Sequence, residues 1–391
     1  MSSNLPYHVY YDLSFINNNT TGGNDPVVLT LSDTRTNPYI EDPSDYFVSV
    51  ARFQISTSAL PVFIPQVQLG QADPNKLVYA VTLTWSNAAN TNHYKITTNI
   101  IYVCSDSSIS TPNPPTISQD LSSTYYYVYT YQQWLRMINT ALLTCYNNLA
   151  SAVTAGGDTG FPSFAPYFEY DPIACVFILN ANQLGYDQFV LTNPIKLYFN
   201  SSLFTLFNNL QNLTLTSADA IKYNLPLNYW WNIMIYSMNG TNILQSGANN
   251  FIQMYQEGST IALLNPVESV VLTSGIIPIN NENVGIPRLF NASKQLVGQT
   301  QNNANISPII SDFQIEMSAT NQYKPQISYV PSGEYRLIDL YGSSSLSNIQ
   351  IGVLWKDIFG YFRQFILQSG MQANVKLLFR RKDYYSQKLN N

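Results

Sequence analysis

The stretch that decides the fold runs from Gly333 to Tyr385 and reads GEYRLIDLYGSSSLSNIQIGVLWKDIFGYFRQFILQSGMQANVKLLFRRKDYY. Two strand-like runs, Tyr335–Tyr341 and Ile349–Trp355, are joined by a polar segment rich in glycine and serine. A turn at Ser369–Gly370 leads into a third run. No nucleophile–base pair and no metal-ligand cluster occurs in this stretch, so it indicates a structural scaffold.

The third run, Ala373–Arg380, shows the period-two alternation of a strand with one buried and one wetted face. Leu378 breaks the alternation, so we expect the outer face to be covered in part. The run leads into the densest positive cluster of the chain. The expected inner face holds Ala373, Val375, Leu377 and Phe379, the outer face holds Asn374, Lys376 and Arg380, and the cluster is Arg380, Arg381 and Lys382.

The composition is that of a neutral, aromatic-rich protein. Charged residues make up 10% and aromatic residues 14%, with 29 tyrosines, whereas charged residues make up roughly 25% of typical soluble domains. Neutral polar side chains cost less to desolvate than charged ones, which suits a surface that is buried against neighbouring subunits. An AT-rich genome would supply the same residues, and the two explanations are compatible. The net charge of −5 argues against nucleic acid as the main partner.

The cysteines and the N-terminal sequence bear on the compartment. Cys104, Cys145 and Cys175 are odd in number and far apart, so we expect buried free thiols in a reducing compartment. The first fifteen residues lack a basic start followed by an apolar core, and no apolar run is long enough to span a bilayer. The sequence therefore predicts a protein that is not secreted and has no membrane span.

Many short runs rich in β-branched and aromatic residues are separated by turn signals. Tyr229–Tyr236 is apolar on both alternating faces, which predicts a central strand covered on both sides. Besides the C-terminal runs, the expected strands are Val27–Leu31, Phe47–Ile55, Leu77–Trp85, Tyr94–Val103, Tyr167–Tyr170, Ile173–Leu179, Ile195–Phe199, Tyr229–Tyr236, Ile261–Leu264, Val267–Thr273, Ile309–Met317 and Gln326–Val330.

One helix is expected near residues 130–150, where apolar residues recur at three- and four-residue steps. Thr130 and Gln133 fit a capping box at its start, and Gly156 and Gly157 mark its end. A short second helix is possible at Leu203–Leu210. The predicted fold class is all-β, a single jelly roll (an antiparallel β-sandwich) with one or two covering helices.

Candidate catalytic and metal sites are sparse. His8 lies in an expected N-terminal arm and His93 follows a polar loop, and neither has a carboxylate or cysteine at ligand spacing. The acids Glu41, Asp42 and Asp45 are interpreted as turn-forming, with a calcium site as the alternative. No phosphate-binding or dinucleotide motif is present. We therefore predict no enzyme activity, no metal and no cofactor.

The basic cluster and the tryptophan before it have two interpretations each. Lys376, Arg380, Arg381 and Lys382 form either a solvated strand end or a contact to an acidic surface, such as packaged DNA or a neighbouring subunit. Trp355, within the second run, is interpreted as a core residue rather than a binding platform.

Five segments, taken in order across nearly the whole chain, carry a family resemblance. The chain resembles the penton proteins (minor capsid proteins of the vertex) of virophages, Sputnik virophage first among them, and of Polinton-like double-stranded DNA viruses. The segments are Phe47–Pro65 (FVSVARFQISTSALPVFIP), Tyr131–Leu143 (YQQWLRMINTALL), Tyr167–Leu179 (YFEYDPIACVFIL), Val270–Pro278 (VVLTSGIIP) and Gly333–Tyr385 with its GEYRLIDL and VKLLFRRK blocks.

The resemblance implies a jelly roll on the capsid floor with an inserted outer domain. It implies homopentamers that close the fivefold vertices of an icosahedral virion and contact hexamers of the major capsid protein, with other minor capsid proteins and packaged DNA as further possible partners. Synthesis in the host cytoplasm is expected. The expected divisions are 1–65 (N-terminal arm and first strands), 66–258 (remaining strands, the helix and the inserted region) and 259–391 (last strands and basic tail).

Two alternatives from other functional classes stay open at this point. The aromatic surplus would suit a sugar-binding β-sandwich, such as a fibre head or a lectin-like attachment module. Such a protein should show solvent-facing aromatic residues gathered in one cleft, whereas a vertex protein should bury its tyrosines along its flanks. A jelly-roll hydrolase would instead need a cleft with two strongly perturbed acids.

Overall fold

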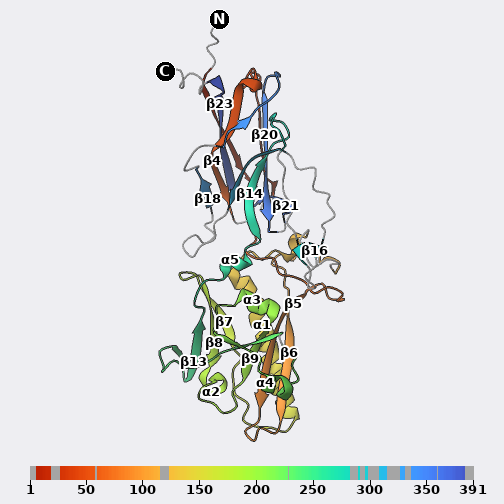
Figure 1. Cartoon of the computed structure of the whole chain (residues 1–391), viewed down its shortest axis with the longest axis vertical. Helices are drawn as coiled ribbons and strands as arrows, with labels where there is room; N and C mark the ends of the chain where they lie inside the picture. The colour runs from red at the N-terminus through yellow and green to blue at the C-terminus, as the bar shows by residue number, and fades with distance from the viewer. Residues whose placement is uncertain are drawn as a thin grey trace. The chain divides into compact units, whose positions relative to one another are not determined.

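The structure is a computed structural model of the 391-residue chain (Figure 1). It describes residues 6–18, 27–57, 60–114, 123–227, 229–281, 289–290, 296–297, 308–314, 326–330, 336–358 and 360–383.

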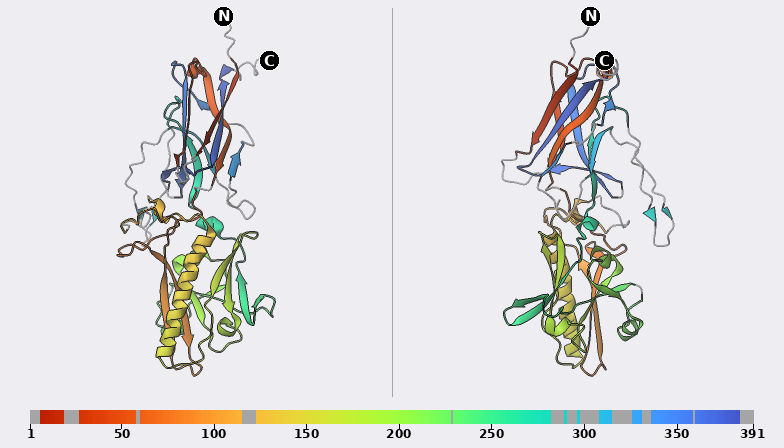
Figure 2. Two further views of the ribbon diagram at one scale, coloured as in Figure 1. Left: turned by 180° about the vertical axis from the view of Figure 1, so that it is seen from behind. Right: turned by 60° about the vertical axis from the view of Figure 1, so that its left-hand side comes forward.

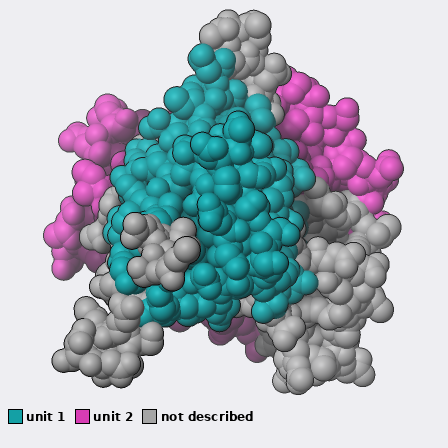
Figure 3. Space-filling view, turned by 90° about the horizontal axis from the view of Figure 1, so that it is seen from above, with its two compact units in different colours: residues 1–60, 266–316, 323–391 teal, residues 61–265, 317–322 magenta. Residues whose placement is uncertain are grey.

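The chain forms two compact units, which Figure 3 colours separately. The first unit draws on residues 1–60, 266–316 and 323–391, and the second on residues 61–265, so the second is inserted into the first. The sequence-based divisions had boundaries after residues 65 and 258. Every described strand between Lys76 and Tyr255 lies in the second unit.

The first unit is a sandwich of two antiparallel sheets. One sheet has the order β1-β23-β4-β18, with β19 also on β4, and the other has the order β17-β14-β20-β21, with β3 also on β20. The rings of Phe53 and Phe313 stack at 5.2 Å between the two sheets. The strands are β1 His8–Ile16, β2 Val27–Val28, β3 Thr30–Thr34, β4 Tyr46–Ser56, β14 Val267–Thr273, β15 Leu289–Phe290, β16 Leu296–Val297, β17 Ile309–Gln314, β18 Gln326–Tyr329, β19 Ile338–Asp339, β20 Asn348–Asp357, β21 Phe362–Gln364, β22 Ile366–Leu367 and β23 Gln372–Arg381.

The stretch that begins at Gly333 supplies a central strand to each sheet, whereas its first expected strand, Tyr335–Tyr341, is reduced among the described residues to the two residues of β19. β20 pairs with β14, β21 and β3, and β23 lies between β1 and β4 (Figure 2). Ala373, Val375, Leu377 and Phe379 are all buried, which confirms the predicted inner face. Leu378 is also buried, at the point where the register with β4 shifts between Lys376 and Leu377. The predicted partial cover of the outer face is therefore confirmed.

The second unit contains two more antiparallel sheets, of order β10-β11-β9-β5-β6 and β12-β13-β8-β7. The long helix α1 packs against β5, β6 and β7. The elements are β5 Lys76–Ser86, β6 His93–Ile101, the 3-10 turn η2 Thr124–Tyr126, α1 Tyr131–Ala155, β7 Tyr167–Asp171, β8 Val176–Asn182, α2 Gln183–Tyr186, β9 Lys196–Asn200, α3 Ser201–Leu206, β10 Asn212–Thr214, α4 Ser217–Lys222, β11 Trp230–Ile233, β12 Ile243–Ser246, β13 Asn249–Tyr255 and α5 Ile261–Leu264. The first unit also holds a 3-10 turn, η1 Pro43–Asp45.

Helix α1 begins and ends where the sequence predicted. The Thr130 side chain accepts a hydrogen bond from the Gln133 backbone N–H at 3.1 Å. The Gln133 side chain reaches the N–H of Tyr129, one residue before the expected partner. Gly156 ends the helix, and its backbone approaches the Tyr94 ring so closely that a Cβ would lie 2.1 Å from the Tyr94 hydroxyl. Any other residue there would displace the Tyr94 ring.

Three predictions about elements are wrong. His8 does not lie in an arm but begins β1, which pairs along its whole length with β23. Ile261–Leu264 is the helix α5 and not a strand, because Ile261 and Leu264 are buried at a three-residue step while the two residues between them are exposed. The short helices α2, α4 and α5 were not predicted.

The third error concerns the apolar run Tyr229–Tyr236. Only Trp230–Ile233 is a strand, and its neighbour β10 is a three-residue edge strand. Tyr229 is 64% exposed and both tryptophans are half-buried. Met234 and Ile235 are buried outside the strand, so a continuous apolar run here marks a strand followed by a buried loop rather than one doubly covered strand.

Candidate functional site

The four predicted site residues lie on and directly after β23. Lys376, Arg380 and Arg381 are in the strand, and Lys382 follows it. Lys376 forms an ion pair with Asp12 of β1 at 3.4 Å, and the Arg380 Nε donates to the His8 imidazole at 3.3 Å. These two side chains lie on the outer face of the sheet.

The other two cations close the end of the strand. Arg381 forms an ion pair with Asp383 at 3.0 Å. Lys382 forms one with Asp339 at 2.9 Å and donates to the Leu340 carbonyl oxygen at 3.2 Å. The cluster is therefore divided into an outward-facing pair and a pair neutralised by acids at the strand end. Its role in assembly stays a prediction.

A second polar cluster, which sequence reasoning missed, joins the first strand to the other sheet. Asp33 of β3 accepts hydrogen bonds from the hydroxyls of Tyr11 and Tyr39. The Arg35 guanidinium lies over both rings, 4.8 Å from the centre of Tyr11 and 5.1 Å from that of Tyr39. The Tyr11 hydroxyl, then that of Tyr39 and the Arg35 charge, lower the pKa of Asp33. Only the pairing of β1 with β23 brings Tyr11 to Asp33, so no local sequence signal announces the cluster.

The acidic segment before β4 forms a turn. The Asp42 carboxylate accepts from the Ser44 backbone N–H at 3.0 Å and from the Ser44 hydroxyl at 2.6 Å, and it caps the turn η1. The turn-forming interpretation of Asp42 is confirmed. No group of three or more potential metal ligands occurs among the residues that the structure describes.

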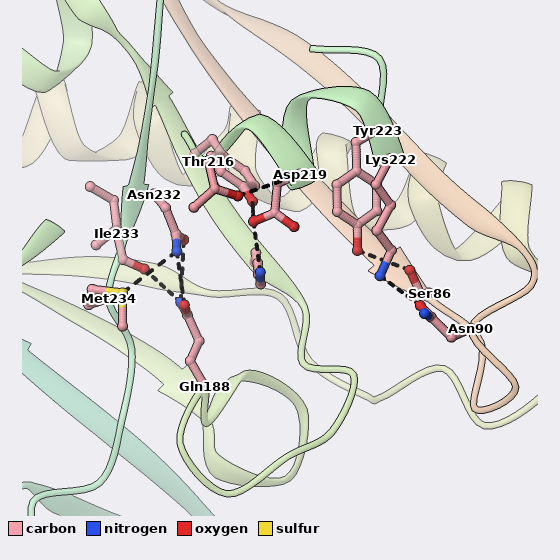
Figure 4. A network of polar contacts seen from close by, with 12 residues as sticks. Ser86, Asn90, Gln188, Thr216, Asp219, Lys222, Tyr223, Asn232, Ile233 and Met234 are labelled. Carbon is pink, nitrogen blue, oxygen red and sulfur yellow. Dashed lines mark hydrogen bonds and ion pairs between the residues drawn. The ribbon is translucent and has the colours of Figure 1, made fainter. Parts of the chain in front are cut away.

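His93 belongs to a hydrogen-bond chain in the second unit, of which Figure 4 shows Ser86 and Tyr223. Its Nδ1 lies 2.9 Å from the hydroxyl of Ser86, which lies 3.0 Å from the hydroxyl of Tyr223. The third group in the chain is a phenol and not a carboxylate, so it is not a Ser-His-acid arrangement. The chain ties β5, β6 and the segment after α4 together.

A pocket of about 300 Å³ opens in the second unit. Its lining includes the ion pair between Lys196 and Asp219 at 2.9 Å, and the side-chain amides of Gln188 and Asn232, which hydrogen-bond each other at 3.0 Å (Figure 4). No aromatic side chain lines it. The pocket therefore lacks the stacking surface that the sugar-binding alternative requires, and its two charges neutralise each other.

Tyrosines that suggested an exposed sugar platform are largely core residues in the second unit. Tyr102, Tyr125 and Tyr126 are buried, with ring centres 5.1–5.4 Å apart. Tyr186 and Tyr198 are fully buried. Many of the aromatic residues thus pack in the core of the monomer. Composition alone could not distinguish such core residues from residues buried between subunits.

The cysteines and Trp355 differ in their burial. Cys145 and Cys175 are buried and Cys104 is half-exposed, so the prediction of burial is wrong for Cys104; none of the three forms a disulfide. Burial raises the pKa of the Cys145 thiol to about 11. Trp355 is 2% exposed, which confirms it as a core residue. No helix in the described part of the chain is long and apolar enough to span a membrane.

Known proteins resemble this chain over almost its full length. The family described as Sputnik minor capsid protein V18/19 matches residues 9–381. Structural protein V19 of Sputnik virophage is 29% identical over 223 residues, which cover 55% of this chain and 94% of V19. Protein V18 of the same virophage is 32% identical over 164 residues, which cover 40% of this chain and 91% of V18.

Two solved structures share the fold. A chain in the cryo-EM structure of Sputnik virophage, 29% identical, superposes with a TM-score of 0.77 over 97% of this chain and 99% of its own length. The mavirus penton protein, 14% identical, superposes with a TM-score of 0.60 over 96% of this chain and 99% of its own. These matches, with the antiparallel sandwich, confirm the predicted jelly-roll fold with its inserted domain.

Proposed function

Because the chain belongs to the family of Sputnik minor capsid proteins V18/19, we propose that it forms homopentamers that close the fivefold vertices of an icosahedral virion. Its role is structural, in a capsid, and its relatives are capsid proteins rather than enzymes. The observation that carries the proposal is the match in fold, over both units, to a protein described as the mavirus penton protein.

The proposal assigns different roles to the two units. The jelly roll stands in the shell and contacts hexamers of the major capsid protein, with other minor capsid proteins as further neighbours. The inserted unit, residues 61–265, faces outward. It carries five lysines and arginines against nine aspartates and glutamates, so its net charge is −4. The protein is made in the host cytoplasm and acts at the capsid vertex.

Packaged DNA is a secondary partner in this proposal. Three of the four basic residues of the cluster, Lys376, Arg381 and Lys382, form ion pairs with acids of the same chain. Phosphate binding requires a surplus of positive charge over an extended surface. We therefore assign the basic cluster to contacts between protein subunits.

The mass of the purified chain in solution tests the proposed ring. Five copies of the 44.0 kDa chain have a mass of about 220 kDa, and native mass spectrometry or sedimentation distinguishes this species from a monomer or a trimer. We expect a concentration-dependent pentamer. A stable trimer would contradict the proposal and favour an attachment fibre.

A further inference from the structure

One flank of the jelly roll is a sheet face with a surplus of positive charge, and apart from the buried Leu378 no described helix or strand layer covers it. The inner side of the sheet packs on the second sheet, and its other side is exposed. We define the β1–β23–β4 face as the outward side chains of these strands, namely Asp12, Ser14, Arg52, Gln54, Asn374, Lys376 and Arg380.

We propose that the β1–β23–β4 face is the flank that binds a second copy of this chain in the ring, an inference that rests on the proposed homopentamer. The copy is held by charge complementarity. The face carries three cations and one anion, a charge of +2, whereas the rest of the jelly-roll unit carries ten lysines and arginines against thirteen aspartates and glutamates, a charge of −3. Each copy therefore offers a positive flank to the acidic remainder of the next, as a closed ring of non-identical faces requires.

The arrangement of the charged side chains explains why the face keeps a net positive charge in the monomer. Asp12, Lys376 and Arg52 lie in one cross-strand row. The two cations share the single Asp12 carboxylate, with Arg52 at 3.3 Å and Lys376 at 3.4 Å. The three side chains are 35–43% exposed, so the charges are fixed in position and also open to a partner.

The next row of the face is neutral and fixed by hydrogen bonds. Asn374 donates to the Ser14 hydroxyl at 3.0 Å and accepts from Arg52 at 3.2 Å. Ser14 and Asn374 border a recess of about 170 Å³ that is also lined by Gln54. On the outward side of β1, Tyr10 is 58% and Ile16 is 60% exposed. A flat, preorganised face of mixed charges, amides and exposed apolar side chains is typical of a protein–protein interface.

A nucleic acid is the other partner that a positive face could bind. The observations favour protein, because the Asp12 carboxylate pairs with two of the three cations, and the adjoining row of the face holds neutral amides and a hydroxyl. A phosphate backbone would be repelled by Asp12 and gain little from the amides.

Charge reversal on this face, read out by the mass of the full-length chain, tests the proposal. We expect Arg52→Glu and Lys376→Glu each to weaken pentamer formation about tenfold or more, because like charges then meet across the contact. Lys376→Arg should retain assembly. Arg336→Glu is the matched control, since Arg336 is also 42% exposed and ion-paired, with Asp312 on the other sheet. Unchanged melting temperatures will show that the variants fold.

Salt gives a second readout. Raising the NaCl concentration from about 50 to about 500 mM should weaken wild-type assembly and strengthen assembly of the Lys376→Glu variant, because screening reduces the attraction in the first and the like-charge repulsion in the second. If both charge-reversed variants assemble as well as the wild type, this face is not the interface, and the proposal of a pentamer is unaffected. A wild type that stays monomeric under all conditions contradicts the ring and this contact together. Loss of binding to a DNA fragment without loss of assembly would assign the face to nucleic acid.

Discussion

Asp33 shows how single residues hold the first strand in place. Tyr11 of β1 donates to a carboxylate on β3, so β1 is bound to the second sheet of the sandwich as well as to β23. This contact lies at the edge of the jelly roll, where a terminal strand would otherwise be held by one neighbour only. The cluster therefore supports the very strand that supplies Asp12 to the proposed interface.

We predict that Asp33→Asn lowers the urea midpoint of unfolding at neutral pH. The pKa of Asp33 is lowered in the folded state, so its stabilising contribution is present above the ordinary carboxyl pKa of about 4 and is lost as the pH falls through the lowered value. The difference between wild type and variant should thus shrink between pH 7 and pH 3. An equal difference at both pH values would show that the charge of Asp33 does not matter. Tyr10→Phe, on the exposed side of β1, is the control.

The buried ion pair between Asp357 and Arg363 gives a prediction with a larger magnitude. Arg363 donates two hydrogen bonds to one Asp357 oxygen, at 3.0 and 2.9 Å, and the Tyr361 N–H donates to the other oxygen at 2.9 Å. The Asp357 side chain is 0% exposed. Asp357→Ala should therefore lower the free energy of unfolding by about 3 kcal/mol or more, because it leaves a buried cation without its counter-charge.

The neighbouring pair provides the control for this measurement. Lys356 and Glu268 lie 2.9 Å apart, with side chains 21% and 41% exposed. Lys356→Gln should cost less than about 1 kcal/mol, as exposed pairs do. Denaturant titrations of both variants will measure the two losses of unfolding free energy. Equal losses would contradict the explanation that burial makes the pair between Asp357 and Arg363 the more costly one to break.

At the scale of single elements, the N-cap of α1 gives a prediction about stability. Thr130→Ala should lower the free energy of unfolding by about 1 kcal/mol, because the Gln133 backbone N–H loses its acceptor. Thr140→Ala, at an exposed mid-helix position where the hydroxyl donates to the Arg136 carbonyl oxygen, should be neutral or stabilising. Thermal unfolding of both variants will check this ordering, and the reverse ordering would contradict it.

The elements also show what sequence could and could not predict. Strands with a strong period-two pattern, such as β23 and β5, were placed within a residue or two, and α1 was placed by its cap and its apolar stripe. β1 was missed, although apolar Val9, Tyr11, Leu13 and Phe15 alternate in it, because its pairing partner β23 lies more than 350 residues away in the sequence. The Asp33 cluster was missed because it depends on non-local pairing.

At the scale of the whole molecule, the two units have separate sheets and separate cores. We predict that residues 61–265 fold when expressed alone, since their sheets and α1 draw no strand from the rest of the chain. Circular dichroism and a cooperative thermal transition will check this. A fragment that stays unfolded would show that the inserted unit depends on the jelly roll.

The central claim is that this protein closes the fivefold vertex, and its copy number and position in purified particles test that claim most directly. Cryo-electron microscopy with fivefold averaging should show five copies at every vertex, with β20 and β23 inside the shell-forming jelly roll. Density for a monomer or a trimer on a stalk at the vertex, or the absence of the protein from the particles, would contradict the claim.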